Sequence, residues 1–337
     1  MLSHEKVGIV LATYNPNVDF LKKQLKSIQE QTFSQWICHI VDDRSQPSIR
    51  LAITEIVKTD TRFICHFYDE NVGSYHNFER GLNCVKTDNT LTSIAFADQD
   101  DIWHAAKLET LLVALNREQK VLVHSDLALI DASAQVLHPS VWSFEGRYPE
   151  KLTSEFLLLR NTVTGCTILF RTFLLSIILP FPTQTRERWY HDHWIALMAT
   201  TLGPIGHVRT PLVQYRQHGT NVVGALQDTG TLCRELQLWL RKGLPIKLES
   251  YGVHRDLSYA FYQRLYRNNS QYLKQSTLSK YLEKKNPFDQ GEIDGGLAIL
   301  KLGWHAYCVG YCPPGITLRI WLGKLISDVS ILFSSFL

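Results

Sequence analysis

The chain has 337 residues, which is enough for one large domain or for a catalytic domain with a smaller appendage. Hydrophobic residues make up 45% and charged residues 20%, a balance typical of a globular protein and not of a disordered one. The formal net charge of +3 is too small to indicate the concentrated basic surface that nucleic-acid binding needs, so no nucleic-acid partner is expected.

The cysteines and the first residues indicate the cellular compartment. Seven cysteines are scattered along the chain, and even the closest pair, Cys308 and Cys312, matches no zinc signature. We interpret them as buried thiols in a reducing compartment. The first residues lack the charged and apolar regions of a secretory signal, so we expect a cytoplasmic protein. No uninterrupted apolar run in the sequence reaches the roughly 20 residues of a membrane span.

Short apolar runs alternate with helical periods through the first 125 residues. The run 7–12 is continuous and contains β-branched residues, which is typical of a strand buried on both faces. Strands alternating with helices predict an α/β fold with a mostly parallel, Rossmann-like sheet flanked by helices on both faces. Further strands are predicted at 37–41, 62–68, 93–97 and 121–124, and helices at 21–28, 78–85 and 108–115.

The rhythm changes after residue 125. A strand is predicted at 163–170, a helix at 191–201 and a short strand at 212–215. From residue 226 the pattern is helical and less regular, which predicts a catalytic domain over 1–225 and a mainly helical C-terminal region over 226–337. The last stretch, 316–337, is amphipathic to apolar, and it fits either a membrane interface or a helix packed on the core.

Small polar or acidic residues follow four consecutive predicted strands. Since the carboxyl ends of parallel strands meet at the edge of the sheet where ligands bind, these residues should lie close together. Helix capping could explain one acidic strand end, but it explains four in order poorly. The four clusters are Thr13-Tyr14-Asn15-Pro16, Asp42-Asp43-Arg44-Ser45, Asn71-Val72-Gly73 with Asn77, and Asp98-Gln99-Asp100-Asp101.

The last of these clusters has three carboxylates within four residues. Such carboxylates repel one another and raise each other's pKa unless a cation is present. A hard divalent ion such as Mg²⁺ or Mn²⁺ binds through one or two carboxylates while substrate phosphates complete its shell. A solvated acidic turn, with Asp101 capping the next helix, explains Asp101 well but Asp98 and Asp100 poorly.

Two further motifs carry candidate functional residues. Asp192 opens a predicted helix among aromatic residues, in Trp189-Tyr190-His191-Asp192-His193-Trp194. A partly desolvated Asp beside a sugar-binding aromatic wall can act as a general base, although the helix dipole also favours an acid there for capping alone. His218, in Tyr215-Arg216-Gln217-His218, follows a strand, and its loop could bring an imidazole to a metal and a guanidinium to a diphosphate.

At these residues the sequence resembles the family 2 glycosyltransferases with the GT-A fold. It is most similar to the rhamnosyltransferase-like members that build bacterial cell-surface polysaccharides. The resemblance covers about residues 6–225 and depends on the order and spacing of motifs that are each weak alone. Besides the motifs above it includes Gln31-Thr32, Ile102-Trp103, Ser125-Asp126 and Asn161-Thr162-Val163-Thr164-Gly165-Cys166.

The resemblance implies a role for individual residues. Asp100 would ligate the Mg²⁺ or Mn²⁺ that bridges the diphosphate, His218 would add to the metal shell, and Asp192 would be the catalytic base. Gly165 and Trp194 would shape the pocket for sugar and acceptor. The residues implied to contact the nucleotide sugar are Thr13, Tyr14, Asn15, Asp42, Asp43, Asn71, Gly73, Asn77, Asp98, Gln99 and Arg216.

The expected activity is inverting transfer of a sugar from a nucleotide-sugar donor to a hydroxyl of a growing cell-surface glycan. The sugar is either L-rhamnose from dTDP-rhamnose or a hexose or N-acetylhexosamine from a UDP-sugar, and sequence leaves this choice open. The resemblance also implies a lipid-linked glycan acceptor at the inner face of the membrane, and the C-terminal tail would fit peripheral attachment there. The glutamine-rich motif of processive synthases is missing, which indicates one or a few sugars per encounter.

Three other classes are disfavoured to different degrees. A nicotinamide-dependent oxidoreductase needs a G-x-G-x-x-G turn after the first strand, and Thr13-Tyr14-Asn15-Pro16 stands there instead. A P-loop enzyme needs a G-K-[ST] ending, which is also missing. A non-catalytic nucleotide-sugar-binding module stays open, without a feature that favours it.

Overall fold

The computed structural model describes residues 2–147, 149–183, 190–217 and 245–267, and five isolated positions at 299, 302, 320, 321 and 324. The chain divides into two compact units, each described by itself below. The first comprises Met1–Arg147, Val163–Phe181 and Gly203–Gln227, and the second comprises Tyr148–Thr162, Pro182–Leu202 and Asp228–Leu337. The division thus differs from the single predicted boundary at residue 225.

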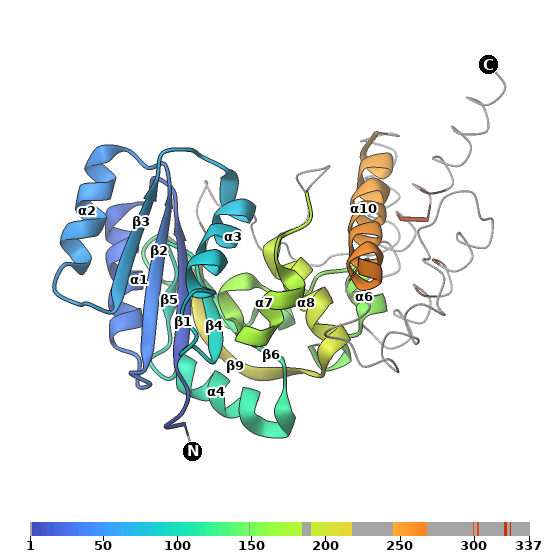
Figure 1. Cartoon of the computed structure of the whole chain (residues 1–337), viewed down its shortest axis with the longest axis horizontal. Helices are drawn as coiled ribbons and strands as arrows, with labels where there is room; N and C mark the ends of the chain where they lie inside the picture. Colours follow the sequence, from blue (N-terminus) through green and yellow to red (C-terminus); the bar gives the residue numbers. More distant parts are fainter. Residues whose placement is uncertain are drawn as a thin grey trace. The chain divides into compact units, whose positions relative to one another are not determined.

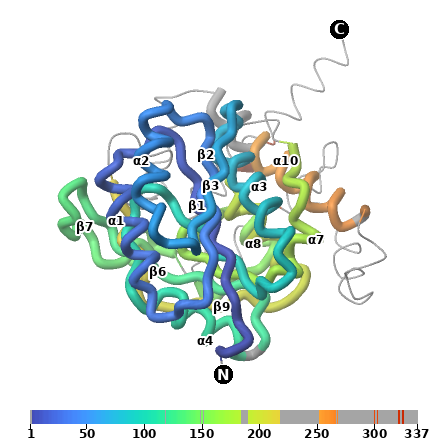
Figure 2. Tube along the Cα trace, turned by 60° about the vertical axis from the view of Figure 1, so that its left-hand side comes forward, coloured from blue at the N-terminus to red at the C-terminus, as the bar shows by residue number. Residues whose placement is uncertain are grey.

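The first unit is built on one mixed sheet. Its strands follow the order β3-β2-β1-β4-β8-β6-β9-β5, with β7 paired to β6 at the periphery (Figure 2). The prediction of a parallel sheet is confirmed for the first four strands, while β8 runs antiparallel to both β4 and β6. The strands are β1 (Val7–Thr13), β2 (Trp36–Asp43), β3 (Phe63–Tyr68), β4 (Ser93–Ala97), β5 (Ile102–Trp103), β6 (Leu122–Ile130), β7 (Val136–His138), β8 (Ile168–Arg171) and β9 (Ile205–Arg216).

Helices cover both faces of the parallel strands, as the sequence predicts (Figure 1). The apolar stripes of α1 (Val18–Gln29), α2 (Pro47–Val57) and α4 (Lys107–Asn116) join one core with every second residue of β1 and β2. The sequence analysis missed α2, the helix between β2 and β3. The short helices α5 (Val141–Phe144) and α7 (Leu175–Ile178) complete the described helices of this unit.

The opposite face of these strands is covered by α3 (Gly73–Val85), which packs unusually close. A Cβ atom at Gly81 would lie 2.2 Å from Cγ1 of Val10, so only glycine permits this approach. The Phe78 and Phe96 rings meet with centroids 4.8 Å apart, and Asn77 donates a hydrogen bond of 2.8 Å to the Val41 carbonyl. The position of α3 against the sheet is therefore fixed along most of its length.

The second unit contains three described helices that contact one another: α6 (Ser154–Leu159), α8 (His191–Leu202) and α10 (Pro245–Arg267). The structure confirms the helix predicted at 191–201 to within one residue. Across the described part of the chain, no helix combines the length and the apolar character that a bilayer span requires. Most of the stretch 316–337 lies outside the described residues.

The structure predicts a pH dependence of folding that depends on His124. This buried side chain of β6 packs against Trp142, and burial, then His207 and Arg147, lower its pKa from 6.5 to about 3. Between those values the unfolded chain binds a proton that the folded chain does not, so stability falls as the pH falls through this window. His124→Gln should therefore weaken this pH dependence. Between about pH 7 and about pH 5 the variant should lose roughly 1 kcal/mol less unfolding free energy per pH unit than the wild type.

Urea denaturation at several pH values measures this effect. The exposed His4 provides the control, since His4→Gln should leave the slope of the wild type unchanged. An unchanged slope in the His124 variant would contradict the assignment of a buried neutral imidazole.

Candidate active site

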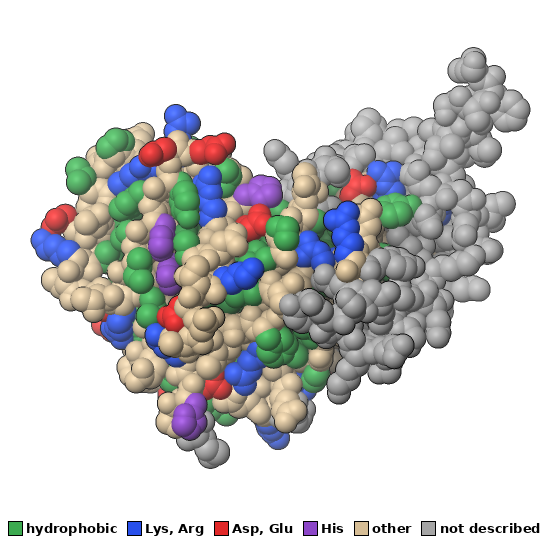
Figure 3. Space-filling model, viewed as in Figure 1, with side chains coloured by type: hydrophobic (Ala, Val, Ile, Leu, Met, Phe, Trp, Pro, Cys, Tyr) green, Lys and Arg blue, Asp and Glu red, His purple; other side chains and the backbone are tan. Residues whose placement is uncertain are grey.

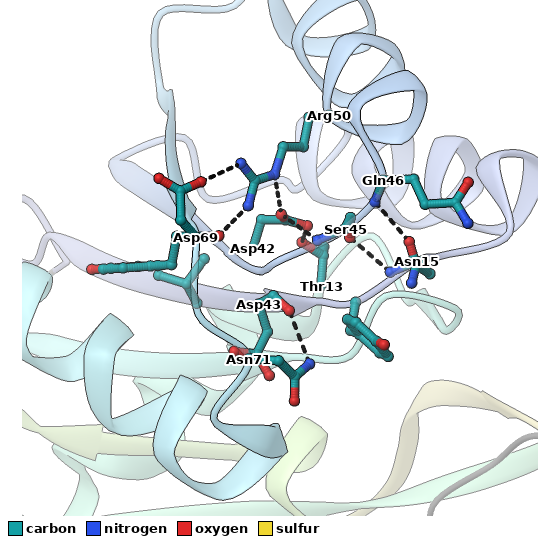
Figure 4. A network of polar contacts seen from close by, with 12 residues as sticks. Thr13, Asn15, Asp42, Asp43, Ser45, Gln46, Arg50, Asp69 and Asn71 are labelled. Carbon is teal, nitrogen blue, oxygen red and sulfur yellow. Dashed lines mark hydrogen bonds and ion pairs between the residues drawn. The ribbon is translucent and has the colours of Figure 1, made fainter.

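The loops that follow β1 and β2 are joined to each other by hydrogen bonds (Figure 4). The backbone N–H of Asn15 donates to Oγ of Ser45 at 2.7 Å, and Oδ1 of Asn15 accepts from the N–H of Gln46 at 2.9 Å. Asn15 and Arg44 both have positive φ, 42° and 69°, and asparagine tolerates this conformation better than most residues. The two strand ends therefore form one structural piece.

The buried Asp42 also links the ends of β1 and β2. Its carboxylate is buried and accepts hydrogen bonds from Oγ1 of Thr13 at 3.1 Å and from the N–H of Ser45 at 2.9 Å. Nε of Arg50 donates to it at 3.0 Å (Figure 4). Thr13 and Asp42 thus bind protein atoms and position the loops, and their contact with the nucleotide stays a prediction.

Asp43 fixes the beginning of α3. Its two carboxylate oxygens accept from the N–H groups of Val72 and Gly73, each at 2.9 Å, and Nη1 of Arg80 lies 3.1 Å away. Nδ2 of Asn71 donates to the Asp43 carbonyl at 3.0 Å. Since the helix has no side-chain cap of its own, Asp43 satisfies N–H groups that would otherwise lack partners. Asp43 and Asn77 are both buried, so in the structure they also bind protein atoms.

Tyr14 and Gln99 join the end of β1 to the end of β4. Oε1 of Gln99 accepts from the N–H of Tyr14 at 2.8 Å, and Nε2 of Gln99 donates to the Tyr14 carbonyl at 3.4 Å. The Tyr14 side chain is 53% exposed, which is unusual for a large aromatic residue on a sheet edge. An aromatic ring held by its backbone and open to solvent can stack on a planar base.

The acidic cluster after β4 divides into exposed and buried members. Asp98 and Asp100 are partly exposed, whereas Asp101 is fully buried. The prediction that Asp101 caps the next helix is wrong: α4 begins after Ala106 without a side-chain cap. Asp101 instead accepts a hydrogen bond from the N–H of Arg216 at 3.2 Å, because β5, which begins at the next residue, pairs with β9.

Arg216 is hydrogen-bonded to the backbone of this cluster. Its side chain is fully buried and donates to the backbone carbonyls of Asp100 at 2.9 Å, Asp131 at 2.8 Å and Ala132 at 3.0 Å. Its guanidinium also lies 4.4 Å from the centroid of the Phe20 ring. With these contacts the guanidinium positions the Asp100 backbone, and the diphosphate contact expected from sequence stays a prediction.

Lys107 and Cys166 are site residues that the sequence analysis missed. Nζ of the buried Lys107 donates to the Cys166 carbonyl at 2.6 Å and lies 3.2 Å from the centroid of the Trp103 ring. Burial lowers the pKa of Lys107 to about 7, although Cys166, Asp101 and Asp98 oppose the shift. In the sequence, Lys107 has the helical spacing of a surface lysine, so the pattern of residues did not indicate that it is buried.

The carboxylates create a negative field that could hold a cation. Burial, then Asp98 and Asp100, raise the pKa of Asp101 well above its usual value, and the pKa of Tyr215 is raised by burial and by the same acids. Ligand atoms of Asp98, Asp101 and Cys166 lie within 4.8 Å of one another. Oxygen donors fit Mg²⁺ or Mn²⁺, but the Cys166 thiol does not, since burial raises its pKa well above the usual value. Of these three, Asp98 combines an oxygen donor with partial exposure, and Asp100, two residues further on, is also partly exposed.

The remaining predicted residues lie in different places. In the second unit, Asp192 is partly exposed and accepts from Nδ2 of Asn161 at 3.0 Å and from the N–H of His193 at 2.6 Å. Trp194 is fully buried and Cζ of Arg264 lies 5.3 Å from the centroid of its ring, so the side chain packs inside the second unit, and its role in the sugar pocket stays a prediction. Gly165 begins a buried turn of the first unit, and His218 lies outside the described residues.

Comparisons with known proteins agree on one family. Residues 8–177 match the model of glycosyl transferase family 2. An uncharacterized glycosyltransferase of Nostoc sp. is 25% identical over 317 residues, covering 90% of each chain. UDP-Glc:alpha-D-GlcNAc-diphosphoundecaprenol beta-1,3-glucosyltransferase of Escherichia coli is 25% identical over 196 residues, 57% of this chain and 69% of that one.

Solved structures agree on the fold. The crystal structure of TarS from S. aureus in complex with UDP-GlcNAc aligns with a TM-score of 0.52 and 15% sequence identity. The alignment covers 96% of this chain and 92% of that one. At this identity the likeness shows the fold alone, which is the GT-A fold expected from the sequence.

Arg216→Lys tests the support beneath the acidic cluster. Lysine cannot donate to three carbonyls in the geometry of a guanidinium, so buried acceptors lose partners and the unfolding free energy should fall by about 2–4 kcal/mol. Arg209→Lys, at an exposed position of the same strand, should change it by less than about 0.5 kcal/mol. Urea denaturation measures both, and equal effects of the two variants would show that the buried contacts contribute nothing.

Proposed function

Because this chain belongs to glycosyl transferase family 2, we propose that it transfers one sugar at a time from a nucleotide-sugar donor to a hydroxyl of a growing cell-surface glycan, with inversion. One observation carries the proposal. The ends of β1, β2 and β4 are joined by hydrogen bonds, and they leave Tyr14, Asp98 and Asp100 accessible at one edge of the sheet. An aromatic ring beside carboxylates suits a base and a metal-bound diphosphate.

The donor is proposed to lie along this edge with its base at Tyr14. Tyr14 is held at its backbone by Gln99, so its exposed ring is oriented before the donor arrives. Asn15 and Asn71 flank the same edge, and Gly73 gives the chain the positive φ of 78° needed to enter α3. Thr13, Asp42, Asp43 and Asn77 would act through these loops, since each of these side chains makes hydrogen bonds within the protein.

The ion proposed for this site is Mg²⁺ or Mn²⁺, held by Asp100 and Asp98. When bound, such an ion neutralises the charge that builds up on the nucleoside diphosphate leaving group. His218 stays a predicted further ligand. The chain's own contribution is the orientation of Asp100, whose backbone carbonyl is held by Nε of Arg216 at 2.9 Å.

Asp192 is the proposed catalytic base. All other residues of 191–199 are buried, so Asp192 is the one carboxylate that this part of α8 exposes to an acceptor. Asn161 and the N–H of His193 bind its Oδ1, which orients the carboxylate. In the reaction the carboxylate takes the proton of the acceptor hydroxyl while that oxygen attacks the anomeric carbon and the diphosphate departs. One displacement inverts the anomeric centre.

A UDP-hexose or UDP-N-acetylhexosamine is the donor class with the most support. The Escherichia coli relative is named for a UDP-Glc donor and a GlcNAc-diphosphoundecaprenol acceptor, and TarS was crystallised with UDP-GlcNAc. The predicted dTDP-L-rhamnose donor shares the pyrimidine diphosphate and stays the alternative. A lipid-linked glycan acceptor is proposed on the same relative. The inner face of the membrane and peripheral contact through the C-terminal tail stay predictions from the family resemblance.

A donor panel tests the function. Purified protein with Mn²⁺ should release nucleotide from a UDP-sugar or from dTDP-L-rhamnose, and a chelator should stop the release. Asp100→Asn should lower turnover by at least about a hundredfold, while Asp19→Asn, at an exposed site in the first turn of α1, should not change it. Release from GDP-sugars alone would contradict the donor proposal, and binding without turnover would indicate a non-catalytic module.

Asp192→Asn tests the base. It should lower kcat by about 10²–10⁴-fold while the dissociation constant of the donor, measured by calorimetry, stays near that of the wild type. Glu155→Gln removes a carboxylate from the first turn of α6 in the same unit and should leave kcat unchanged. Near-wild-type turnover of the Asp192 variant would assign the base to another residue.

A further inference from the structure

Two imidazoles and a thiol meet between the sheet and α3 in the first unit. The parallel register places His39 opposite Ile64 and His66 opposite Val41, so both histidines point to the same face. This is the face that α3 covers, and Cys84 reaches it from the last turn of that helix. The three side chains thus come from three separate elements.

The distances suit one metal ion. Nδ1 of His39 lies 3.0 Å from Nε2 of His66, and these atoms and Sγ of Cys84 are all within 4.8 Å of one another. A tetrahedral zinc ion with ordinary bond lengths separates two nitrogen ligands by about 3.3 Å and nitrogen from sulfur by about 3.6 Å. Small side-chain adjustments are therefore enough to close the site.

We propose that His39, His66 and Cys84 bind Zn²⁺ at a site separate from the carboxylates at the end of β4. Imidazole and thiolate are the ligands that select Zn²⁺ over the hard ions Mg²⁺ and Mn²⁺. No role in sugar transfer uses these three residues, so the proposal does not depend on the proposed function. A water molecule completes the four-coordinate shell.

The protonation states permit this binding. A neutral pair of imidazoles shares one proton on the line between the two facing nitrogens. Moving that proton to the outer nitrogen of its ring frees both facing lone pairs, and rotation of the rings about their side-chain bonds directs them to one ion. The Cys84 thiol loses its proton to water as the zinc–sulfur bond forms, so each zinc ion bound releases one proton.

The site is reachable from solvent. His66 and Cys84 are both partly exposed, and histidine side chains reach the surface over β2 and β3 in Figure 3. The hydroxyl of Tyr68 lies 3.7 Å from Sγ of Cys84, which gives the pocket a second polar group beside the thiol. A zinc ion can therefore enter without unfolding of the sheet.

Cobalt absorption and zinc titration test the proposal on the full chain after treatment with a chelator. One equivalent of Co²⁺ should give a thiolate-to-cobalt charge-transfer band, and Zn²⁺ should displace it and raise the melting temperature. Cys84→Ser should remove the band and weaken zinc binding by at least about tenfold, since losing even an outer-shell partner costs about 10–100-fold. His66→Gln should weaken binding similarly.

Two cysteines serve as controls. Cys65 is on the same strand as His66 but faces the other side of the sheet, so Cys65→Ser should keep the band. Loss of the band in Cys166→Ser with retention in Cys84→Ser would place the metal beside Asp98 and Asp101 and overturn the proposal. Absence of any cobalt band or zinc binding in the folded wild type, with folding checked by circular dichroism, would overturn it as well.

Discussion

The carboxylate of Asp43 accepts the N–H groups of Val72 and Gly73, and this pair of hydrogen bonds fixes where α3 begins. The helix has no side-chain cap of its own, and a negative charge at a helix N-terminus stabilises it by about 0.3–1 kcal/mol. Arg80, about two turns further along α3, contacts the same carboxylate at 3.1 Å. The strand end, the turn and the first two turns of the helix are therefore held together by these contacts, and they support the edge of the sheet proposed to bind the donor.

The acids at this edge differ in burial, and this difference determines which of them can meet a ligand. A buried carboxylate is costly unless hydrogen bonds compensate it, and Asp42 and Asp43 each have several. Asp101 is equally buried, and burial, then its neighbours Asp98 and Asp100, raise its pKa well above the usual value. Hence the two neighbours, which keep contact with solvent, are the acids suited to meet a cation, and the buried three shape the loops.

Much of this could be predicted from sequence because it depends on local pattern. Alternating apolar runs and helical periods gave the parallel strands, and the polar strand ends gave the edge. The pattern could not predict the contacts of Arg216 or Lys107, because these join residues distant in the chain. Nε of Arg216 lies 2.9 Å from the Asp100 carbonyl, and Nζ of Lys107 lies 2.6 Å from the Cys166 carbonyl. Asp101 was misassigned for the same reason: its partner is the N–H of Arg216 on a strand 115 positions away.

Helix α3 connects the edge proposed to bind the donor to the proposed zinc site. From Asp43 the contacts run through Arg80 to the ring of Tyr68 at 4.4 Å, and from the Tyr68 hydroxyl to Cys84 at 3.7 Å. Contiguity alone does not make coupling, which needs an element with two arrangements. The close approach of Gly81 to Val10 and the bond from Asn77 to Val41 leave α3 one arrangement. A zinc ion at Cys84 would therefore stabilise the helix on the sheet, and its effect on donor binding should be small.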